Sequence, residues 1–311
     1  MPVFAILVHT QPSLVARLVE RLHPYPIVMH VDVRTDASAF AALPRTTYVR
    51  HRVPVRWGGF SMVRATSLLY EHALQVANPD EHIVLLSGQC YPARPIAEFA
   101  RFLSDSPFRQ HCKAGLVFDG TREQRRLTRR WYWDHLPAGP GSTYLVRAAA
   151  RRAVAFMAPR RSEAVFEPLR PVAGSQWTAL TADCVRDLLV RSRDSHLIGL
   201  FKNTLAPDES FFHTLLYNSR WRHQVADPVL APRGVRTTSD FANFHYIRPT
   251  LKGIVTLSDL EAIKRSEMFF VRKVSANQSD DLLDALDGMN IEGNAHPSTP
   301  RSPKTGRHSN H

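Results

Sequence analysis

The stretch that decides the fold is VFAILVHTQPSLVARLVERLHPYPIVMHVD, residues 3–32. It begins with Val3 to Val8, a continuous apolar run with the length of a buried strand. Apolar residues at helical spacing follow from Gln11 to Leu22, and a second buried run, Ile27 to Val31, ends at Asp32. This order predicts a strand, a helix and a second strand.

The same alternation continues toward the middle of the chain. Further helices are expected at residues 61–76 and 96–103, and further strands at residues 82–86 and 116–118. Helices that alternate with strands indicate an α/β fold with a mostly parallel central sheet flanked by helices. In such sheets ligands bind beyond the carboxyl ends of the strands, where Asp32 and Ser87 stand.

The composition of the 311 residues, 44% hydrophobic and 22% charged, is that of a globular protein with a full core. No run of eighteen apolar residues and no signal-peptide pattern occurs, so we expect a cytoplasmic protein. From residue 276 onward the chain becomes polar. We expect residues 276–311 to be a largely disordered tail, with a short helix at residues 280–286.

The formal net charge of +12 is concentrated between Arg122 and Arg161, which includes ten arginines against Glu123 and Asp134. Such a stripe attracts phosphates, anionic lipid or acidic glycans, and it is equally typical of a solvated helix face. The three cysteines form no CxxC pair, so we expect buried thiols and neither a zinc site nor a disulfide framework.

The stretch Leu205 to Phe212 carries the most specific chemical signal. Its Pro-Asp-Glu turn precedes apolar residues at helical spacing, so Asp208 is expected to cap a helix and Glu209 to fall in its first turn. A carboxylate held there can take a proton from a sugar hydroxyl. The alternative is structural, because acidic residues favour any helix N-terminus.

The familiar phosphate-binding and hydrolase motifs are missing from the chain. It contains no GxGxxG, GxxxxGK[ST], GxSxG or HExxH motif. At the end of the second strand, Asp32-Val33-Arg34 has a cation where a metal-binding Asp-x-Asp pair has its second carboxylate, so a metal is disfavoured there. Fixed cations must then stabilise a departing diphosphate, and Arg272 and Lys273 are the candidates. Such a pair is also common as a plain surface feature.

Six segments, in order, resemble the core-2/I-branching β-1,6-N-acetylglucosaminyltransferase family, glycosyltransferase family 14, which includes the peptide O-xylosyltransferases. They are FAILVH (4–9) with MHVD (29–32), VRWGGFS (55–61), LLSGQCYP (85–92), GSQW (174–177), PDE (207–209) and MFFVRK (268–273). The segments span nearly all of the chain that we expect to be ordered. The resemblance implies one glycosyltransferase domain over residues 1–275 with a GT-A-like fold, in a bacterial member of the family.

The resemblance also implies a reaction and its residues. It implies an inverting displacement without a metal or other cofactor, in which Glu209 deprotonates the acceptor and Arg272 and Lys273 contact the phosphates of a UDP-sugar. Asp32 matches a nucleoside contact. A second phosphate contact falls on either Arg248 or Lys252, an alternative that the sequence leaves open.

Further residues of the matching segments are assigned to the two substrates. Ser87 and Gly88 are placed on the donor side. The acceptor and sugar pocket is assigned to Trp57, Trp177, Ser175, Gln176 and Glu123. For the two tryptophans, packing within the fold is the competing interpretation.

We therefore predict transfer of GlcNAc or xylose from a UDP-sugar to a hydroxyl of a glycan or lipid-linked saccharide. A peripheral contact with the anionic inner face of a membrane is a further expectation, and no nucleic acid is expected as a partner. One alternative is a protein that binds acidic polymers or nucleic acid, because of the arginine stripe. The other is an inactive, glycan-binding relative.

Overall fold

A five-stranded sheet forms the centre of the computed structural model, which describes residues 1–117, 122–135, 144–226, 242–248 and 253–295. The strand order is β3-β2-β1-β4-β8, and all neighbours are parallel except β4 and β8. The strands are β1 (Val3–Val8), β2 (Ile27–Val31), β3 (Thr46–Tyr48), β4 (His82–Ser87) and β8 (Ala179–Thr181). The predicted α/β fold with a mostly parallel sheet is confirmed.

The central strand β1 is buried on both faces, and its side chains alternate between two cores. Val3, Ala5 and Leu7 join one apolar cluster, which includes residues of α2 (Ser61–Ala73), α6 (Ala182–Ser192) and α8 (Phe211–Tyr217). Phe4, Ile6 and Val8 join the other, which includes residues of α1 (Pro12–Arg21) and α3 (Ile96–Asp105). Successive residues of a strand point to opposite faces, so a continuous apolar run is what a sheet covered on both sides requires.

Two smaller sheets lie beside the central one. The first has the order β5-β10-β9 and comprises β5 (Cys90–Pro92), β10 (Phe270–Arg272) and β9 (His245–Ile247). The second pairs β6 (Ala114–Leu116) with β7 (Val172–Gly174) in antiparallel fashion. The strand expected at residues 116–118 is therefore shifted and does not extend the parallel sheet. Its last residue lies outside the described residues.

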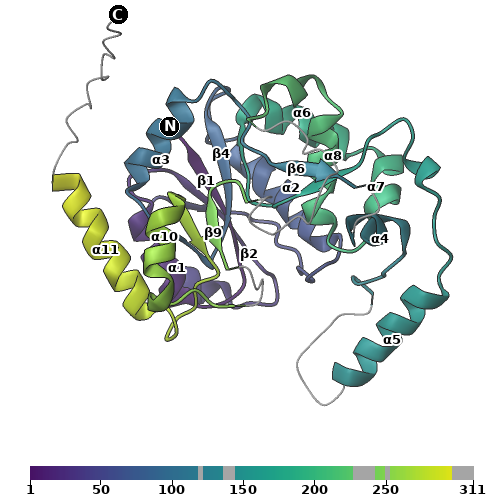
Figure 1. Ribbon diagram of the computed structural model, residues 1–311, viewed down its shortest axis with the longest axis horizontal. Coiled ribbons are helices and arrows are strands. Elements are labelled where there is room, and N and C mark those ends of the chain that lie inside the picture. Colours follow the sequence, from purple (N-terminus) through teal and green to yellow (C-terminus); the bar gives the residue numbers. More distant parts are fainter. Residues whose placement is uncertain (118–121, 136–143, 227–241, 249–252, 296–311) are drawn as a thin grey trace, which may run out of the picture.

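The remaining helices surround these sheets (Figure 1). The α-helices are α4 (Arg122–Thr128), α5 (Tyr144–Met157), α7 (Ser195–Phe201), α10 (Leu260–Ser266) and α11 (Asp280–Ala295). The 3-10 helices are η1 (Ala37–Phe40), η2 (Glu163–Phe166), η3 (Pro207–Glu209), η4 (Arg220–Gln224) and η5 (Leu257–Asp259). The basic middle of the chain is thus two helices, α4 and α5, and α5 projects from the body in Figure 1.

The segment after residue 275 differs from the expected disordered tail. Helix α11 is longer than the predicted residues 280–286, and its leucines Leu282, Leu283 and Leu286 are buried in the core on the α1 side of the sheet. Arg17 of α1 donates to Asp287, and the Tyr91 hydroxyl donates to the same carboxylate at 2.7 Å. Apolar burial, the ion pair and the hydrogen bond fix the helix to the domain, although four of its first eight residues are aspartates.

The three cysteines, Cys90, Cys112 and Cys184, are free and buried, as predicted. Across the described ranges we find no helix that is long and apolar enough to span a bilayer.

Candidate active site

Three polar residues lie at the carboxyl edge of the central sheet. In the parallel register Val8 lies opposite Val31, and Leu7 lies opposite Ser87. His9, Asp32 and Ser87 are consequently neighbours at the ends of β1, β2 and β4. The sequence predicted this edge as the binding region, and the register brings Asp32 and Ser87 together there.

Asp32 is 2% exposed, and both of its carboxylate oxygens are engaged. Arg34 donates from its backbone N–H and from its guanidinium, with Nη2 2.7 Å from Oδ2, and the Val55 N–H donates to Oδ2 at 2.9 Å. Burial alone would raise the pKa of Asp32, but the hydrogen bonds from Arg34 and Val55 outweigh it and keep the pKa below its usual value. A nucleoside could contact this carboxylate only by displacing one of these donors.

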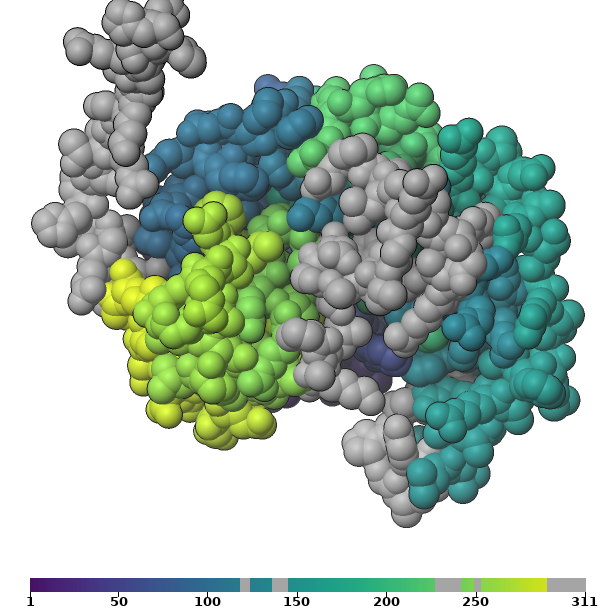
Figure 2. Space-filling model, viewed as in Figure 1, coloured from purple at the N-terminus to yellow at the C-terminus, as the bar shows by residue number. Residues whose placement is uncertain are grey.

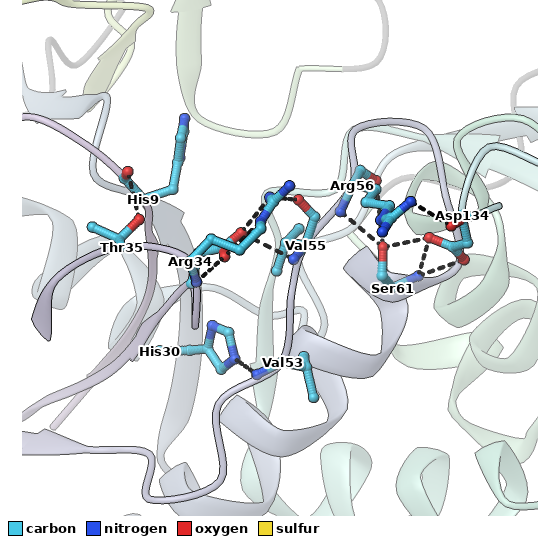
Figure 3. Close-up of polar contacts among 10 residues, drawn as sticks. His9, His30, Arg34, Thr35, Val53, Val55, Arg56, Ser61 and Asp134 are labelled. Carbon is cyan, nitrogen blue, oxygen red and sulfur yellow. Dashed lines mark hydrogen bonds and ion pairs between the residues drawn. The ribbon is translucent and has the colours of Figure 1, made fainter. Parts of the chain in front are cut away.

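A series of polar contacts fixes residues 53–61 against the strand ends (Figure 3). His30 accepts the Val53 N–H at Nε2, 3.1 Å away, and burial lowers the His30 pKa to about 4, so the ring stays neutral and can accept. At the other end, the Ser61 hydroxyl donates to Asp134 at 2.6 Å and the Ser61 N–H donates at 3.1 Å. Asp134 therefore occupies the N-terminus of α2, where a carboxylate is favoured.

The glycines of the segment allow a close approach of residues 133–134. Gly58 has φ +76°, a region that favours glycine, and a Cβ at Gly59 would lie 2.2 Å from Asp134 Oδ1. Trp57 precedes them and is 67% exposed; its ring packs edge-on against Trp133 with centroids 5.0 Å apart. Trp57 is thus a largely exposed aromatic side chain beside Trp133, of a kind that can stack on a sugar.

The Pro-Asp-Glu turn lies directly against this loop, since the Ala206 N–H donates to the Gly58 carbonyl at 3.0 Å. Glu209 ends the 3-10 turn η3, and its side chain is 42% exposed. Its Oε2 receives the Arg126 guanidinium, and Oε1 accepts no hydrogen bond from the described residues. One carboxylate oxygen is therefore oriented by an arginine, and the other is open to an acceptor hydroxyl.

Asp208 does not cap the following helix, contrary to the sequence prediction. The N-cap of α8 is Ser210, without a side-chain cap bond, and Asp208 instead borders a cavity of about 10 Å³, room for roughly one water. Its buried Oδ1 has no partner in the described structure. Burial, reinforced by the neighbouring charge of Glu209, raises the pKa of Asp208 to about 7. The two carboxylates of the turn thus have opposite surroundings.

Arg272 and Lys273 form a half-buried pair of cations at the end of β10. The Arg272 guanidinium lies over the Trp177 ring, 4.2 Å from its centroid, and Nη1 donates to the Ser87 hydroxyl. Among the described residues, neither side chain forms an ion pair with a carboxylate. Burial and the adjacent Arg272 charge lower the pKa of Lys273. An anion is therefore the partner that these two charges lack.

The Arg272 charge acts on groups at both the sheet edge and the Pro-Asp-Glu turn. The Arg272 charge lowers the pKa of His9 at the end of β1, after the larger effect of burial and the opposing effect of Asp32. It also favours the ionised form of Asp208, which lies beside Glu209. The Arg272 charge therefore influences the ionisation of a group at the sheet edge and of a group in the turn.

A model of the Core-2/I-branching enzymes matches residues 3–228 of the chain. The chain belongs to the Core-2/I-branching enzyme family. This membership confirms the family resemblance found in the sequence motifs and makes the protein a glycosyltransferase by family.

Two curated relatives of this Core-2/I-branching chain are named Xylosyltransferase oxt. The protein from Drosophila melanogaster is 26% identical over 208 residues, which are 64% of this chain and 22% of the relative. That from Drosophila pseudoobscura pseudoobscura is 26% identical over 215 residues, 66% of this chain and 22% of the relative. The chain thus spans about a fifth of the length of either relative.

A solved 4-diphosphocytidyl-2C-methyl-D-erythritol synthase covers 64% of this chain and 82% of its own, with 9% identity. Its TM-score is 0.31, which is too low for an argument about function.

Several residues that the sequence assigned to substrates have structural partners in this family member. Trp177 is buried beneath Arg272, and Gln176 donates to the Thr66 hydroxyl at 3.3 Å beside the small cavity. The Ser175 carbonyl oxygen lies 2.9 Å from His213 Nε2. Gly88 packs closely on α1, where a Cβ would come within 2.9 Å of a methyl group of Val15. These contacts give each of the residues a structural partner, and their assignment to the substrates stays a prediction.

The two candidates for a second phosphate contact have different outcomes. Arg248 donates to the Asp259 carboxylate at 2.8 Å and to the Ile254 carbonyl at 2.9 Å, so its charge is already paired. Lys252 lies outside the described residues. Glu123 is on α4, but its side chain lies outside the described part of the structure.

Sequence reasoning missed the role of Arg126 as the partner of Glu209. The two residues are 83 positions apart, and no local pattern links them. In the sequence, Arg126 is only one of the ten arginines between Arg122 and Arg161. The sequence also assigned no site role to Asp208.

The structure describes no group of three His, Cys, Asp or Glu side chains able to hold a metal ion in residues 1–117, 122–135, 144–226, 242–248 and 253–295.

Proposed function

We propose that the protein is an inverting glycosyltransferase that uses fixed cations in place of a metal and moves a sugar from a UDP-sugar to an acceptor hydroxyl. The observation that carries the proposal is the pair Arg272 and Lys273, half-buried without a carboxylate partner in the described structure. The Arg272 charge also acts on Asp208 of the Pro-Asp-Glu turn. A diphosphate supplies the missing negative charge.

In the proposed step, Glu209 removes the proton of the acceptor hydroxyl through its open Oε1. The hydroxyl oxygen attacks the anomeric carbon from the side opposite the diphosphate. The bond from that carbon to the diphosphate oxygen breaks, and its electron pair leaves with UDP. Arg272 and Lys273 then neutralise the charge that develops on the leaving group, which is a large electrostatic contribution in a partly buried site. A single displacement inverts the anomeric configuration.

The division of roles within the turn follows from the surroundings of its two carboxylates. Asp208 holds its proton up to about neutral pH because it is buried beside another carboxylate. Glu209 is partly exposed and oriented by Arg126, so it is the carboxylate that we assign as the base.

Metal independence is supported by the donor set at the end of β2. The Asp32 carboxylate, which a metal would need, is saturated by the Arg34 guanidinium and two backbone N–H groups. The Arg34 guanidinium thus supplies a positive charge at this carboxylate. We propose that Asp32 shapes the nucleoside side of the site through Arg34 and Val55.

The donor sugar is proposed to be xylose or GlcNAc, and the names of the curated relatives favour xylose as the first donor to assay. The proposed acceptor is a glycan or a lipid-linked saccharide. The exposed ring of Trp57, next to the Pro-Asp-Glu turn, is the proposed stacking surface for it.

The nucleic-acid alternative loses support because the arginine stripe is not a uniform solvent-facing surface. Arg126 pairs with Glu209, Arg151 lies over Trp133, and Arg161 donates to two backbone carbonyls. These side chains serve the fold or the site.

The test is UDP release from UDP-xylose and UDP-GlcNAc, with and without EDTA. Glu209→Gln should lower turnover by roughly 10²- to 10⁴-fold, the usual contribution of a general base, while UDP affinity measured by calorimetry stays within about twofold. Glu261→Gln, an exposed glutamate paired with Lys264 on α10, is the matched control and should retain full turnover. Undiminished turnover of Glu209→Gln, or activity that EDTA abolishes and Mn²⁺ restores, would contradict the mechanism. UDP-sugar binding without turnover in the unmodified protein would favour an inactive relative.

A further inference from the structure

Helix α5 exposes a continuous apolar face to solvent. Leu145, Val146, Phe156 and Met157 are 75%, 70%, 82% and 79% exposed. At 100° per residue they fall, with the exposed alanines at positions 149, 150 and 153, within about 140° of the helix circumference. Single exposed apolar residues are ordinary, but a face of seven neighbours without a polar residue marks an interaction surface.

The opposite side of α5 holds the helix to the domain. Arg151 is buried, with its guanidinium over the Trp133 ring at 4.4 Å, and Ala155 is buried beside it. After the helix, Arg161 donates to the Leu127 and Leu200 carbonyls at 2.7 Å. The exposed apolar face is therefore set by these contacts and cannot turn inward without breaking them. Figure 2 shows this part of the chain at the lower right rim of the molecule.

Exposed arginines flank the apolar face. Arg152 lies next to one edge and Arg147 next to the other, and α5 contains no acidic residue. Arginine side chains at such edges can extend toward phosphate groups while the apolar residues enter the acyl boundary. The net charge of +12 adds long-range attraction to an anionic surface.

We infer that α5 is a membrane-surface helix, which lies in the interface of an anionic bilayer with Leu145, Val146, Phe156 and Met157 inserted and Arg147 and Arg152 on lipid phosphates. Charge complementarity selects this partner. Apolar residues alone fit a second protein copy equally well, but the flanking arginines would place like charges face to face in a symmetric pair of copies.

The position of α5 also relates the membrane to the active site. Trp133, which carries the Arg151 contact, packs on Trp57, and the Trp57 loop bonds the Pro-Asp-Glu turn. A bilayer bound to α5 thus lies on the side of the molecule where we propose the acceptor. The relation between the bilayer and the acceptor rests on the proposed function and suits a lipid-linked acceptor, whereas membrane binding itself does not depend on catalysis.

The test is co-sedimentation of the full chain with vesicles of phosphatidylcholine alone and of a one-to-one mixture with phosphatidylglycerol. We expect binding to the mixed vesicles only, weakened by high salt. The double variant Phe156→Ser with Met157→Ser should bind about tenfold or more weakly. Arg147→Gln and Arg152→Gln should each weaken binding about fivefold. Val190→Ser, at an exposed apolar position on α6, is the matched control and should bind like the unmodified chain.

Two measurements separate this inference from the proposed function. They are thermal unfolding and the release of UDP from the UDP-sugar in the presence of a soluble acceptor mixture. The double variant should keep the melting temperature and the rate of UDP release of the unmodified chain, because the side chains at positions 156 and 157 are exposed. The inference is overturned if the unmodified chain ignores both vesicle types, or if the double variant binds them undiminished. It is also overturned if light scattering shows a dimer that the double variant converts to a monomer without any vesicle binding.

Discussion

Replacing Arg272 by methionine separates a functional charge from a structural one. Methionine keeps much of the apolar stem that covers Trp177 but removes the guanidinium that lies over the ring and contacts Ser87. Since the guanidinium has no carboxylate partner in the described structure, its removal breaks no ion pair. It also relieves the charge that lowers the pKa of Lys273, so that pKa should rise.

The size of the effect on catalysis follows from the charge that is lost. Two unit charges about 4 Å apart interact by about 4 kcal/mol at an effective dielectric constant of 20. Arg272 is half-buried and Lys273 remains, so we expect about half of that value as a lower bound. The ratio kcat/KM should therefore fall by roughly 30- to 1000-fold. The free energy of unfolding should change by less than about 1 kcal/mol.

The assay combines UDP release with urea denaturation, and Arg248→Met is the matched comparison. Arg248 is paired with Asp259, whose side chain is 10% exposed, so removing Arg248 leaves a buried carboxylate without its cation. We expect Arg248→Met to lose about 1 to 3 kcal/mol of stability and to keep kcat/KM for the folded fraction. The two arginines, both named as phosphate candidates from the sequence, should thus give opposite phenotypes.

The reasoning would be refuted by an Arg272→Met protein that binds UDP and turns over normally but unfolds about 2 kcal/mol more easily. That result would make Arg272 a structural residue, and the leaving-group charge would need another partner.

Two further predictions concern stability. Asp208→Asn should become more stable relative to the unmodified chain as pH rises from about 4 to about 7, because the ionised form of Asp208 is disfavoured in the folded state. The difference in the free energy of unfolding should reach at most about 4 kcal/mol. Denaturation at several pH values measures it. A pH-independent difference would contradict the buried acid. Gly59→Ala should lower the free energy of unfolding by about 1 to 2 kcal/mol, since the added methyl group displaces Asp134 from the N-terminus of α2. Gly199→Ala should not destabilise the protein, because a Cβ there would have no heavy atom within 4 Å. Equal melting temperatures for the two alanine variants would count against that account.

The elements of the fold that local pattern governs were predicted from the sequence. The runs at residues 3–8 and 27–31 became β1 and β2 with the expected ends, and the helical stripe at residues 11–22 became α1. Their burial depends on residue type and spacing, which are written in the chain itself. The family was recognisable for the same reason, because its motifs lie at strand ends and turns of fixed local chemistry.

The pairing of distant groups was decided only by the tertiary structure. Residues 114–116 joined a separate antiparallel pair, and α11 became part of the core, because each found its partner far along the chain. The same holds for the site: Glu209 received Arg126, Arg248 was neutralised by Asp259, and Arg272 was left without a carboxylate among the described residues. Residue type determines which charges a protein has, but folding determines which of them are neutralised, as Arg248 is by Asp259, and which keep no carboxylate partner in the described structure, as Arg272 does.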